Sequence, residues 1–290
     1  MKKYIILIPI YNDRESLAKL IENINIETKD LNSKISIIVV NDASSQQIID
    51  NYQNIENISF IEIINMKENR GHARCIASGL KYIFEKKEFD YVIPMDGDGE
   101  DRPEEIKNFI RHAEQPNNKA IVGERTKRSE NLFFKVCYQL HKILTLGFTG
   151  KSIKFGNFTC LSKSTIEKML NEKATWNSFS GSLKKIEKDL LSIPSIRGVR
   201  YFGPSKMSFF NLLKHSFSII SVFKTTLLIR SILFLIAYLF LIVGQISFIT
   251  LIPVIAVIII VISVITLSRR ENMSEFNNSL ENIERFDKIK

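Results

Sequence analysis

In FDYVIPMDGDGED, residues 89–101, an apolar run passes directly into a cluster of carboxylates. Apolar runs of this kind are typical of strands buried in a parallel sheet, and ligands bind such sheets beyond the carboxyl ends of the strands. The chain carries a net charge of +9 at pH 7, yet acidic residues crowd this point: Asp96, Asp98, Glu100 and Asp101. Carboxylates this close repel one another, so the cluster predicts a bound cation.

The residues on either side of this stretch alternate between two periodicities. Runs rich in Ile and Val are typical of β-strands, and the segments between them place apolar residues at helical spacing. Strands separated by helices predict an α/β fold with a mainly parallel sheet that is covered on both faces. The strands are expected at residues 4–10, 35–40, 58–64, 89–95 and 119–124.

Helices are expected between these strands. Asn12, followed three residues later by Glu15, predicts a capping box at the start of the first helix. Pro103 opens the last of them, because proline is favoured at the first helical position. The first helix places four apolar residues on one face: Leu17, Leu20, Ile21 and Ile24. A short helix is expected near 46–52 and a longer one over 71–86.

Residues 231–267 contain no charged residue. One membrane span needs about 20 apolar residues, so this run predicts two transmembrane helices. The turn between them is expected near 244–247, where small and polar residues interrupt the run. A helical hairpin buried in a soluble protein is the alternative, but over such a length it would turn a charged residue toward water. Because Arg230, Arg269 and Arg270 flank the run, the positive-inside rule predicts that both of its ends are cytoplasmic.

The segment before this hairpin is amphipathic. Residues 207–230 place Phe, Leu and Ile on one side and Lys214, His215 and Lys224 elsewhere, which is typical of a helix lying in the membrane interface. A plain anchor flanked by lysines is the other interpretation. After the hairpin, apolar residues at helical spacing predict a short surface or oligomer-contact helix: Met273, Phe276, Leu280 and Ile283.

These patterns divide the chain into parts. The α/β domain covers residues 1–200, the juxtamembrane segment 201–229, the transmembrane hairpin 230–268 and a cytoplasmic tail 269–290. The first residues resemble a signal peptide, but Pro9 interrupts a short apolar stretch, which favours a strand. The three cysteines lack CxxC spacing, so they predict neither a disulfide framework nor a zinc site.

Several kinds of site can be compared for DGDGED, residues 96–101. An EF-hand calcium loop is excluded, because Asp101 and Lys107 stand where that loop needs Gly and Glu. A haloacid-dehalogenase phosphohydrolase also places D-x-D-G after a strand, but near the start of the chain and with Thr or Val where Glu100 stands. A solvated acidic turn without a ligand fits Asp101 better than Asp96 and Asp98, which come directly after the strand. The D-x-D pair suits Mg²⁺ or Mn²⁺, which takes one or two carboxylates and leaves room for phosphate oxygens.

Five segments follow the motifs of one family in order and spacing. LIPIYNDRESL resembles V-x-P-x-Y-N-E, VVNDASS resembles D-D-G-S, and ENRGHARCIASGL resembles N-x-G-x-x-x-A-x-x-x-G-L. MDGDGEDRPEEI resembles D-A-D-x-Q-H-P-P-E, and VGERTKR resembles V-G-S-R. Together they resemble the family-2 glycosyltransferases of GT-A fold, in the branch that glycosylates polyprenyl phosphates. YFGPSKMSFF and the C-terminal hairpin also resemble this branch, which implies a Rossmann-like GT-A domain with an interfacial helix and a membrane hairpin.

The resemblance implies a role for each matching residue. Asp98 and Glu100 would hold the metal ion, with Glu100 standing where the family has Gln. The catalytic group would be Asp96, Asp98 and Arg125, and the acceptor phosphate would meet Arg125, Arg128 and Lys206, with Arg200 nearby. The residues lining the nucleotide-sugar pocket would be Pro9, Tyr11, Asp13, Asp42, Asn69, Gly71 and Asp96.

Some positions depart from the family pattern. Asn41 replaces the first Asp of D-D-G-S, Arg102 replaces the first Pro of the P-P pair, and Thr159 replaces an Arg. A neutral hydroxyl cannot pair with phosphate as an arginine fork does, so Thr159 bears on acceptor binding. No Q-x-x-R-W segment is present, which argues against a processive polysaccharide synthase. Trp176 is interpreted as a packing or interfacial aromatic.

The resemblance implies an inverting transfer of a sugar from a nucleotide-diphosphate donor to a membrane polyprenyl phosphate, with Mg²⁺ or Mn²⁺ as cofactor, for envelope glycan modification. The alternatives are a family-2 transferase with a hydroxyl acceptor and a non-catalytic, membrane-tethered nucleotide-sugar binding protein. The expected partners are the donor, the lipid phosphate and the membrane; a homo-oligomer is left open and nucleic acid is not expected. The expected location is the cytoplasmic (inner) membrane, with the catalytic domain and both termini cytoplasmic.

Overall fold

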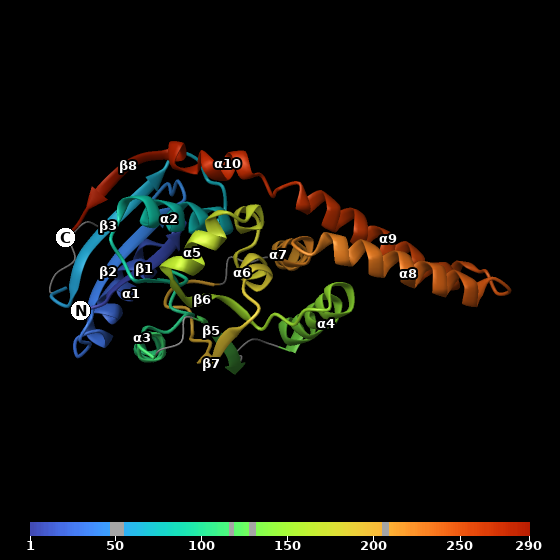
Figure 1. The fold of residues 1–290 in the computed structure, drawn as a ribbon, viewed down its shortest axis with the longest axis horizontal. Helices are drawn as coiled ribbons and strands as arrows, with labels where there is room; N and C mark the ends of the chain where they lie inside the picture. The colour runs from blue at the N-terminus through green and yellow to red at the C-terminus, as the bar shows by residue number, and fades with distance from the viewer. Residues whose placement is uncertain (47–54, 116–118, 128–131, 205–208) are drawn as a thin grey trace.

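The computed structural model describes residues 1–46, 55–115, 119–127, 132–204 and 209–290. In these residues the chain folds into a sheet covered by helices, from which two long helices project together at one end (Figure 1). Eight strands form the described sheet, in the order β7-β5-β6-β4-β1-β2-β3-β8. The short helix predicted near 46–52 lies almost entirely outside the described residues.

The strands and the longer helices predicted for the N-terminal half are confirmed, with ends displaced by a few residues. β1 pairs in parallel with both β2 and β4, and β2 pairs in parallel with β3, so their carboxyl ends share one edge. The elements are β1 (Lys3–Ile10), α1 (Arg14–Glu27), β2 (Lys34–Asn41), β3 (Ile58–Met66), α2 (His72–Lys86), β4 (Tyr91–Pro94), the 3₁₀ turn η1 (Pro103–Glu105), α3 (Ile106–Ala113) and β5 (Ala120–Lys127).

Apolar layers form on both faces of this sheet, because successive side chains of a strand point to opposite faces. Ile6 and Ile8 of β1 pack with α1 and α3 on one face. Ile5 and Leu7 pack with α2 and with helices of the C-terminal half on the other. All four side chains are buried. The central strands are thus covered on both sides, as their apolar runs predict.

The sheet continues through strands that the sequence pattern did not reveal. β6 lies antiparallel between β4 and β5, and β5 pairs with β7 in parallel. Parallel pairings outnumber antiparallel ones among the described strands, so the prediction of a mainly parallel sheet is confirmed. The added elements are α4 (Leu132–Thr149), β6 (Phe155–Ser162), α5 (Lys163–Leu170), the 3₁₀ turn η2 (Lys173–Trp176), α6 (Phe179–Ile186) and β7 (Leu190–Ile196).

Two described helices are long and apolar enough to cross a membrane: α8 (Lys224–Ile242) and α9 (Phe248–Ser268). They pack against each other as a hairpin (Figure 1). Ser247 caps α9 by accepting a hydrogen bond from the backbone N–H of Thr250, which confirms a turn at 244–247. Large apolar side chains such as Phe240, Leu241 and Ile259 are exposed along the hairpin, as expected of surfaces that face lipid.

The prediction of one interfacial helix over 207–230 is wrong in its length. Within the described residues, α7 (Phe209–Ser221) ends before Val222, and residues 224–230 belong to α8. The Ser221 hydroxyl donates to the Ser218 carbonyl and the Phe223 N–H donates to the Ile220 carbonyl. These bonds satisfy carbonyl groups at the end of α7 and allow the chain to turn there.

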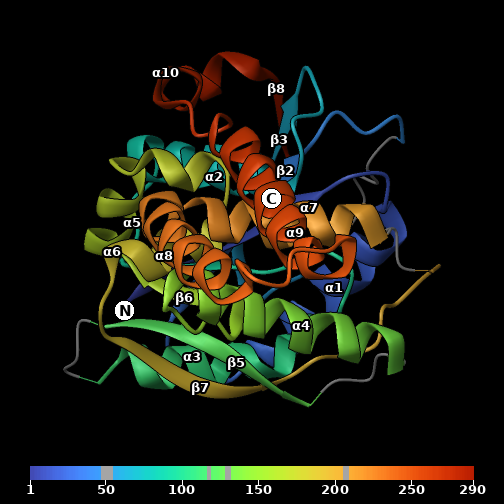
Figure 2. The ribbon, with the colours of Figure 1, turned by 90° about the vertical axis from the view of Figure 1, so that its right-hand side faces the viewer.

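Helix α4 lies across the base of the hairpin, beside α7 and α8 (Figure 2). Arg230 of α8 donates from Nη1 to the carbonyl oxygens of Leu146 at 3.2 Å and Gly147 at 2.8 Å, at the C-terminal end of α4. A cation is favourable at this end of a helix, where carbonyl groups lack partners. The sequence pattern did not predict this contact between α4 and the hairpin.

The prediction of a helix over 273–283 is largely wrong. The tail forms α10 (Met273–Asn277), the 3₁₀ turn η3 (Ser279–Asn282) and β8 (Ile283–Lys288). β8 pairs antiparallel with β3, whose edge offers backbone hydrogen bonds that a helix would leave unused. Phe276 is 1% exposed and stacks on Trp176 with ring centroids 5.5 Å apart, so Trp176 is a packing residue. The tail is therefore part of the α/β domain (Figure 1).

The predicted capping box at α1 is also wrong. The N-cap is Asp13, and its side chain makes no capping hydrogen bond. Asn12 instead accepts hydrogen bonds at Oδ1 from the backbone N–H groups of Ser45 at 2.9 Å and Gln46 at 3.3 Å. Its φ of 50° is left-handed, a conformation that Asn tolerates better than most residues. Asn12 therefore ties the loop after β1 to the loop after β2.

Candidate active site

Loops that follow the central strands meet at the carboxyl edge of the sheet, where open α/β sheets bind their ligands. The loop after β4, residues 96–101, is named the acidic loop. Gly99 in this loop has φ of 88°, a left-handed conformation that glycine adopts without strain. A Cβ at Gly99 would lie 2.6 Å from the ring of Tyr201. The acidic loop is thus closely covered by a second segment, residues 197–204, which is named the arginine strap.

The arginine strap follows β7 and is hydrogen-bonded along the acidic loop. The backbone N–H groups of Gly198 and Tyr201 donate to the carbonyl oxygens of Glu100 at 2.8 Å and Asp98 at 2.9 Å. The hydroxyl of Tyr201 accepts a hydrogen bond from Asn23 of α1 at 2.8 Å. The strap is therefore a fixed wall of the site, held from both the acidic loop and α1.

Two arginines of the strap pair with carboxylates of the site. Arg200 Nη1 lies 2.8 Å from Asp98 Oδ2, and Nη2 of the same guanidinium pairs with Asp13. Arg197 pairs with Glu100. These five side chains are between 14% and 21% exposed, so the ion pairs are largely shielded from water. Both predicted metal ligands thus already have a cationic partner.

Asp96 lies at the head of the acidic loop among polar partners. His72 Nε2 lies 2.9 Å from Asp96 Oδ1, and Asn157 Nδ2 donates to the same oxygen at 3.4 Å. The backbone N–H of Asp96 donates to Asp101 Oδ2 at 2.9 Å. Arg125 Nη2 lies 3.5 Å from Asp101 Oδ1. The predicted residues Asp96 and Arg125 therefore belong to one cluster, joined through Asp101.

Asp96 and Asp101 respond to burial in opposite ways. Burial raises the pKa of Asp101 to about 7, and the negative charge of Asp96 adds to this rise. Burial acts in the same direction on Asp96, but His72 and Arg125 outweigh it and hold the pKa of Asp96 well below its usual range. The pKa of an unfolded Asp is about 3.9, so the stability contributed by Asp101 falls as pH rises from about 4 to about 7.

We expect the Asp96→Asn substitution to lower the pKa of His72. Partial desolvation lowers the pKa of His72, whose side chain is 49% exposed, but the carboxylate of Asp96 raises it more, so that the pKa lies above its ordinary value. The pair stabilises the folded state below the unfolded histidine pKa of about 6.5, and this contribution is lost as pH rises through the higher folded pKa. NMR titration of the four histidine rings measures the change.

The matched control for this titration is Asp90→Asn, which removes an exposed carboxylate at the other end of β4. His72→Gln assigns the His72 signal by its disappearance. A His72 titration curve that is the same in wild type and in Asp96→Asn would contradict the pairing.

Part of the predicted nucleotide-binding set stands where β1 ends. Pro9 is the second-last residue of β1, Tyr11 follows the strand and is 49% exposed, and Asp13 precedes α1. Asp13 is the member of this group that reaches the arginine strap. The structure thus brings Asp13 close to Asp98, through Arg200.

A second part of that set surrounds Asp42, after β2. Asp42 is 4% exposed, and its carboxylate accepts hydrogen bonds from the backbone N–H groups of Arg70 at 2.9 Å and Gly71 at 2.8 Å. Asn69 donates from Nδ2 to the Asp42 carbonyl at 3.2 Å. Asp42 therefore positions the loop that begins α2, and His72 with it.

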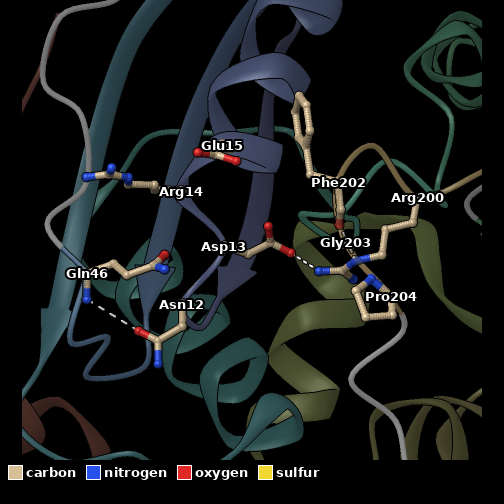
Figure 3. A pocket seen from close by; sticks show the side chains of 9 residues that line it. All are labelled: Asn12, Asp13, Arg14, Glu15, Gln46, Arg200, Phe202, Gly203 and Pro204. Atoms are coloured by element: carbon tan, nitrogen blue, oxygen red, sulfur yellow. Dashed lines mark hydrogen bonds and ion pairs between the residues drawn. The ribbon is translucent and has the colours of Figure 1, made fainter.

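A pocket of about 510 Å³ opens between the start of α1 and the arginine strap (Figure 3). Figure 3 shows Asp13 and Arg200 pointing toward each other from these two elements. Ligand pockets in proteins commonly have volumes of about 300–1,000 Å³, so this one has room for a small molecule. The lining residues are Asn12, Asp13, Arg14, Glu15, Gln46, Arg200, Phe202, Gly203 and Pro204.

The predicted acceptor-phosphate residues are only partly placed. Arg128 and Lys206 lie outside the described residues. Arg125 has a side chain 17% exposed and contacts Asp101. Thr159, which stands where the family has Arg, is buried and donates from its hydroxyl to the Asn157 carbonyl at 3.1 Å. The Thr159 hydroxyl therefore serves the local backbone.

The acidic loop supplies oxygen ligands of the kind that Mg²⁺ and Mn²⁺ prefer, but not a closed cage. In the part of the chain that the structure describes, no group of three or more His, Cys, Asp or Glu side chains is arranged to hold a metal ion. Mg²⁺ commonly takes one or two protein carboxylates and completes its shell with water and substrate phosphates. Asp98 and Glu100 fit that arrangement, in which the cation is shared with a phosphate-bearing ligand.

Some residues of this site were not predicted from the sequence. Arg197 lies outside every matched motif, and no local signal identifies it. Asn157 lies two residues before Thr159, in a segment that was compared with the family pattern, but no role was predicted for it. His72 directly follows Gly71 in a matched segment, and that adjacency could have indicated it. Arg200 was expected near a lipid phosphate, and the structure pairs it with Asp13 and Asp98.

Comparison with known proteins adds to this geometry. The model of the family described as glycosyl transferase family 2 matches residues 5–179. An undecaprenyl-phosphate 4-deoxy-4-formamido-L-arabinose transferase from Photorhabdus laumondii subsp. laumondii is 30% identical over 241 residues, covering 78% of this chain and 69% of that protein. The protein of the same name from Serratia proteamaculans is 29% identical over 240 residues, with the same two coverages.

Solved structures show the same fold. Glucosyl-3-phosphoglycerate synthase from Mycobacterium tuberculosis, in complex with Mn²⁺, UDP and phosphoglyceric acid, has a TM-score of 0.56 at 10% identity over 78% of each chain. Mannosyltransferase PcManGT from Pyrobaculum calidifontis, in complex with GDP-Man and Mn²⁺, has a TM-score of 0.50 at 14% identity, over 97% of this chain and 87% of that one. The predicted GT-A fold is thereby confirmed.

Proposed function

The chain belongs to glycosyl transferase family 2, and we propose that this glycosyltransferase moves a sugar from a nucleotide-diphosphate donor to a polyprenyl phosphate in a membrane. The main support for a polyprenyl-phosphate acceptor is that relatives named as undecaprenyl-phosphate transferases match 78% of the chain. The geometry supports a lipid acceptor. The arginine strap contacts the acidic loop, and the chain runs from the strap toward α7 and the two helices long enough to span a membrane. Donor and lipid phosphate would therefore meet at the membrane surface.

The donor would lie along the carboxyl edge of the sheet. Asp13 beside the pocket and Asp96 at the head of the acidic loop would face its ribose and diphosphate. Tyr11 is exposed at this edge and offers an aromatic face to the base. Pro9, Asp42, Asn69 and Gly71 would shape the same wall, with Asp42 acting through the backbone that it holds.

A divalent cation, Mg²⁺ or Mn²⁺, would be held by Asp98 and Glu100. When bound, such a cation neutralises negative charge on the leaving diphosphate. The structural neighbours named as Mn²⁺ complexes support the use of a divalent cation. Arg125 would add positive charge at the cluster around Asp101, where it meets phosphate of the donor or the acceptor.

The acceptor phosphate would attack the anomeric carbon on the face opposite the leaving diphosphate, which inverts that centre. A phosphate oxygen is already anionic at pH 7, so this reaction needs no strong general base. One observation favours a hydroxyl acceptor as the second candidate: the pKa of Asp101 near 7 is suited to a general base. Asp101 is 4% exposed and bound to the Asp96 backbone, which weighs against that role.

The α/β domain and both termini would lie on the cytoplasmic face of the inner membrane. β8 joins the same sheet as β1, so both ends of the hairpin stay on one side. The arginines that flank the hairpin favour the cytoplasm for that side. Apolar residues of α4 are exposed beside the hairpin, as expected at a membrane surface: Leu140, Ile143 and Leu146.

The proposal is tested by a transfer assay with the full chain purified in detergent, using a panel of radiolabelled nucleotide sugars and polyprenyl phosphate. We expect acid-labile labelled lipid that forms with Mg²⁺ or Mn²⁺ and falls to background with EDTA. Diacylglycerol in place of polyprenyl phosphate is the control acceptor, because it offers a hydroxyl and no phosphate. Label in diacylglycerol alone would support the hydroxyl-acceptor candidate, and donor binding without any labelled lipid would contradict the lipid-phosphate proposal.

A further inference from the structure

The two carboxylates proposed to hold the cation are each paired with an arginine of the strap. Asp98 pairs with Arg200, and Glu100 pairs with Arg197. A free divalent cation that binds these carboxylates must compete with both guanidinium groups. Because the four side chains are mostly buried, the competing ion pairs are weakened little by solvent.

The strap holds these arginines at the site. A Cβ at Gly198 would lie 2.7 Å from the Gly99 carbonyl oxygen, so the two backbones are in direct contact. The hydrogen bonds from Gly198 and Tyr201 to the acidic loop keep them together. The strap backbone is thereby held beside the carboxylates, so a cation that binds them would have to displace the guanidinium side chains.

Arg197 also compensates a negative charge of the acidic loop. Glu100 stands where the resembled family has a neutral Gln, so this chain carries one more negative charge beside the cation site. The residue that pairs with this extra charge is Arg197. The pair adds no net charge to the loop, whereas Glu100 without its partner would attract cations more strongly.

We propose that Arg197 and Arg200 are counter-ions that compete with a free divalent cation for Glu100 and Asp98. The ion pairs of Asp98 with Arg200 and of Glu100 with Arg197 are the observations that carry this proposal. A donor diphosphate brings negative charge that the displaced guanidinium groups can meet, so the cation and the donor are held together. The inference rests on the proposed function only in assigning the cation to Asp98 and Glu100.

The test measures the binding of Mn²⁺ alone to the full chain in detergent, with free Mn²⁺ read by electron paramagnetic resonance. We expect Arg197→Gln to bind Mn²⁺ about tenfold more tightly than wild type, the change expected when one charge-assisted hydrogen bond no longer competes. In the Glu100→Gln background, the same substitution should change the affinity less than twofold, because its partner charge is gone. A damaged fold would weaken binding, so a gain that depends on Glu100 reports the pair itself.

The matched control is Arg285→Gln, which removes an exposed arginine of β8 that pairs with Asp287. It makes the same change in net charge and should leave Mn²⁺ affinity unchanged. Arg200→Gln is the second variant, expected to show a gain through Asp98. Equal Mn²⁺ affinity in wild type and both strap variants, or an equal gain in Arg285→Gln, overturns the proposal. No sugar transfer is involved, so this result is independent of the transfer assay.

Discussion

The Asp98→Asn variant is expected to lose sugar transfer by about 10³-fold while it keeps the fold of the wild-type chain. Asn has the shape of Asp but lacks the charge, so one of the two carboxylates proposed for the cation is removed. Losing one group that stabilises developing charge costs about 10²–10³-fold in kcat, and a group that also holds the cation belongs at the upper end. The transfer assay measures the rate, with polyprenyl phosphate and donor at saturation.

The local structure should tolerate this substitution. The Tyr201 N–H donates to the backbone carbonyl of Asp98, which the change does not touch. The Glu100 N–H donates to Asp98 Oδ1 at 3.0 Å, and an Asn side-chain oxygen can accept the same bond. Arg200 loses its ion pair with Asp98 but keeps the one with Asp13, so the circular dichroism spectrum should match that of wild type while the melting midpoint falls.

Glu88→Gln is the matched control for the rate. Glu88 stands at the opposite end of β4, pairs with Lys3 and has a side chain 88% exposed, so it is remote from the carboxyl edge. Its transfer rate should equal that of wild type. An Asp98→Asn rate within about threefold of wild type would show that the acidic loop does not hold the cation, and the metal assignment would be wrong.

The Phe276→Ala variant is expected to lower the free energy of unfolding by about 3–4 kcal/mol. Phe276 is 1% exposed and packs with Ala77 and Trp176, and the truncation leaves a cavity between α2 and the tail. Glu275 beside it accepts a hydrogen bond from Trp176 Nε1 at 2.9 Å and lies 3.2 Å from Arg74, so the tail is also held by polar contacts. Because the tail is held at several points, we expect the substitution to destabilise the whole α/β domain and not only the end of the chain.

Trp176 makes this measurement direct, because it is the only tryptophan in the chain and stacks on the substituted ring. Its fluorescence, followed through denaturant unfolding of the detergent-solubilised chain, gives the midpoint and slope of the transition and from them the free energy of unfolding. Phe286→Ala is the control from the same tail: Phe286 is 47% exposed and stacks on Tyr82, so about 1 kcal/mol is expected. Equal losses in the two variants would contradict the view that Phe276 is the buried anchor of the tail.

The parts of the fold that could be predicted are those encoded by local patterns. The continuous apolar runs of β1 and β2 indicate strands covered on both faces, and Pro103 marks the start of a helix. The tail shows the limit of such patterns. Its helical spacing is real, but the open edge of β3 offers backbone hydrogen bonds to Ile283 and the residues that follow. Pairing with a distant strand therefore overrides the local preference.

The candidate site divides in the same way. Asp96, Asp98 and Glu100 could be predicted because the carboxyl end of a buried strand is a ligand-binding position wherever it occurs. The hydrogen-bonding partners of Asn12 could not be predicted from the sequence, because Ser45 and Gln46 belong to the loop after another strand. Thr159 was identified as a departure from the family pattern, and the structure shows its hydroxyl used by the local backbone.

Local sequence patterns were enough to predict the alternation of strands and helices, the edge of the sheet where carboxylates gather and the two long apolar helices. These depend on periodicity and composition, which are properties of neighbouring residues. The pairing of charges, in contrast, depends on how distant parts of the chain are folded together. Arg197 and Glu100 are 97 residues apart in the chain, and Arg200 and Asp13 are 187 apart. Only the path of the chain after β7, back across the carboxyl edge, brings these side chains within reach of one another.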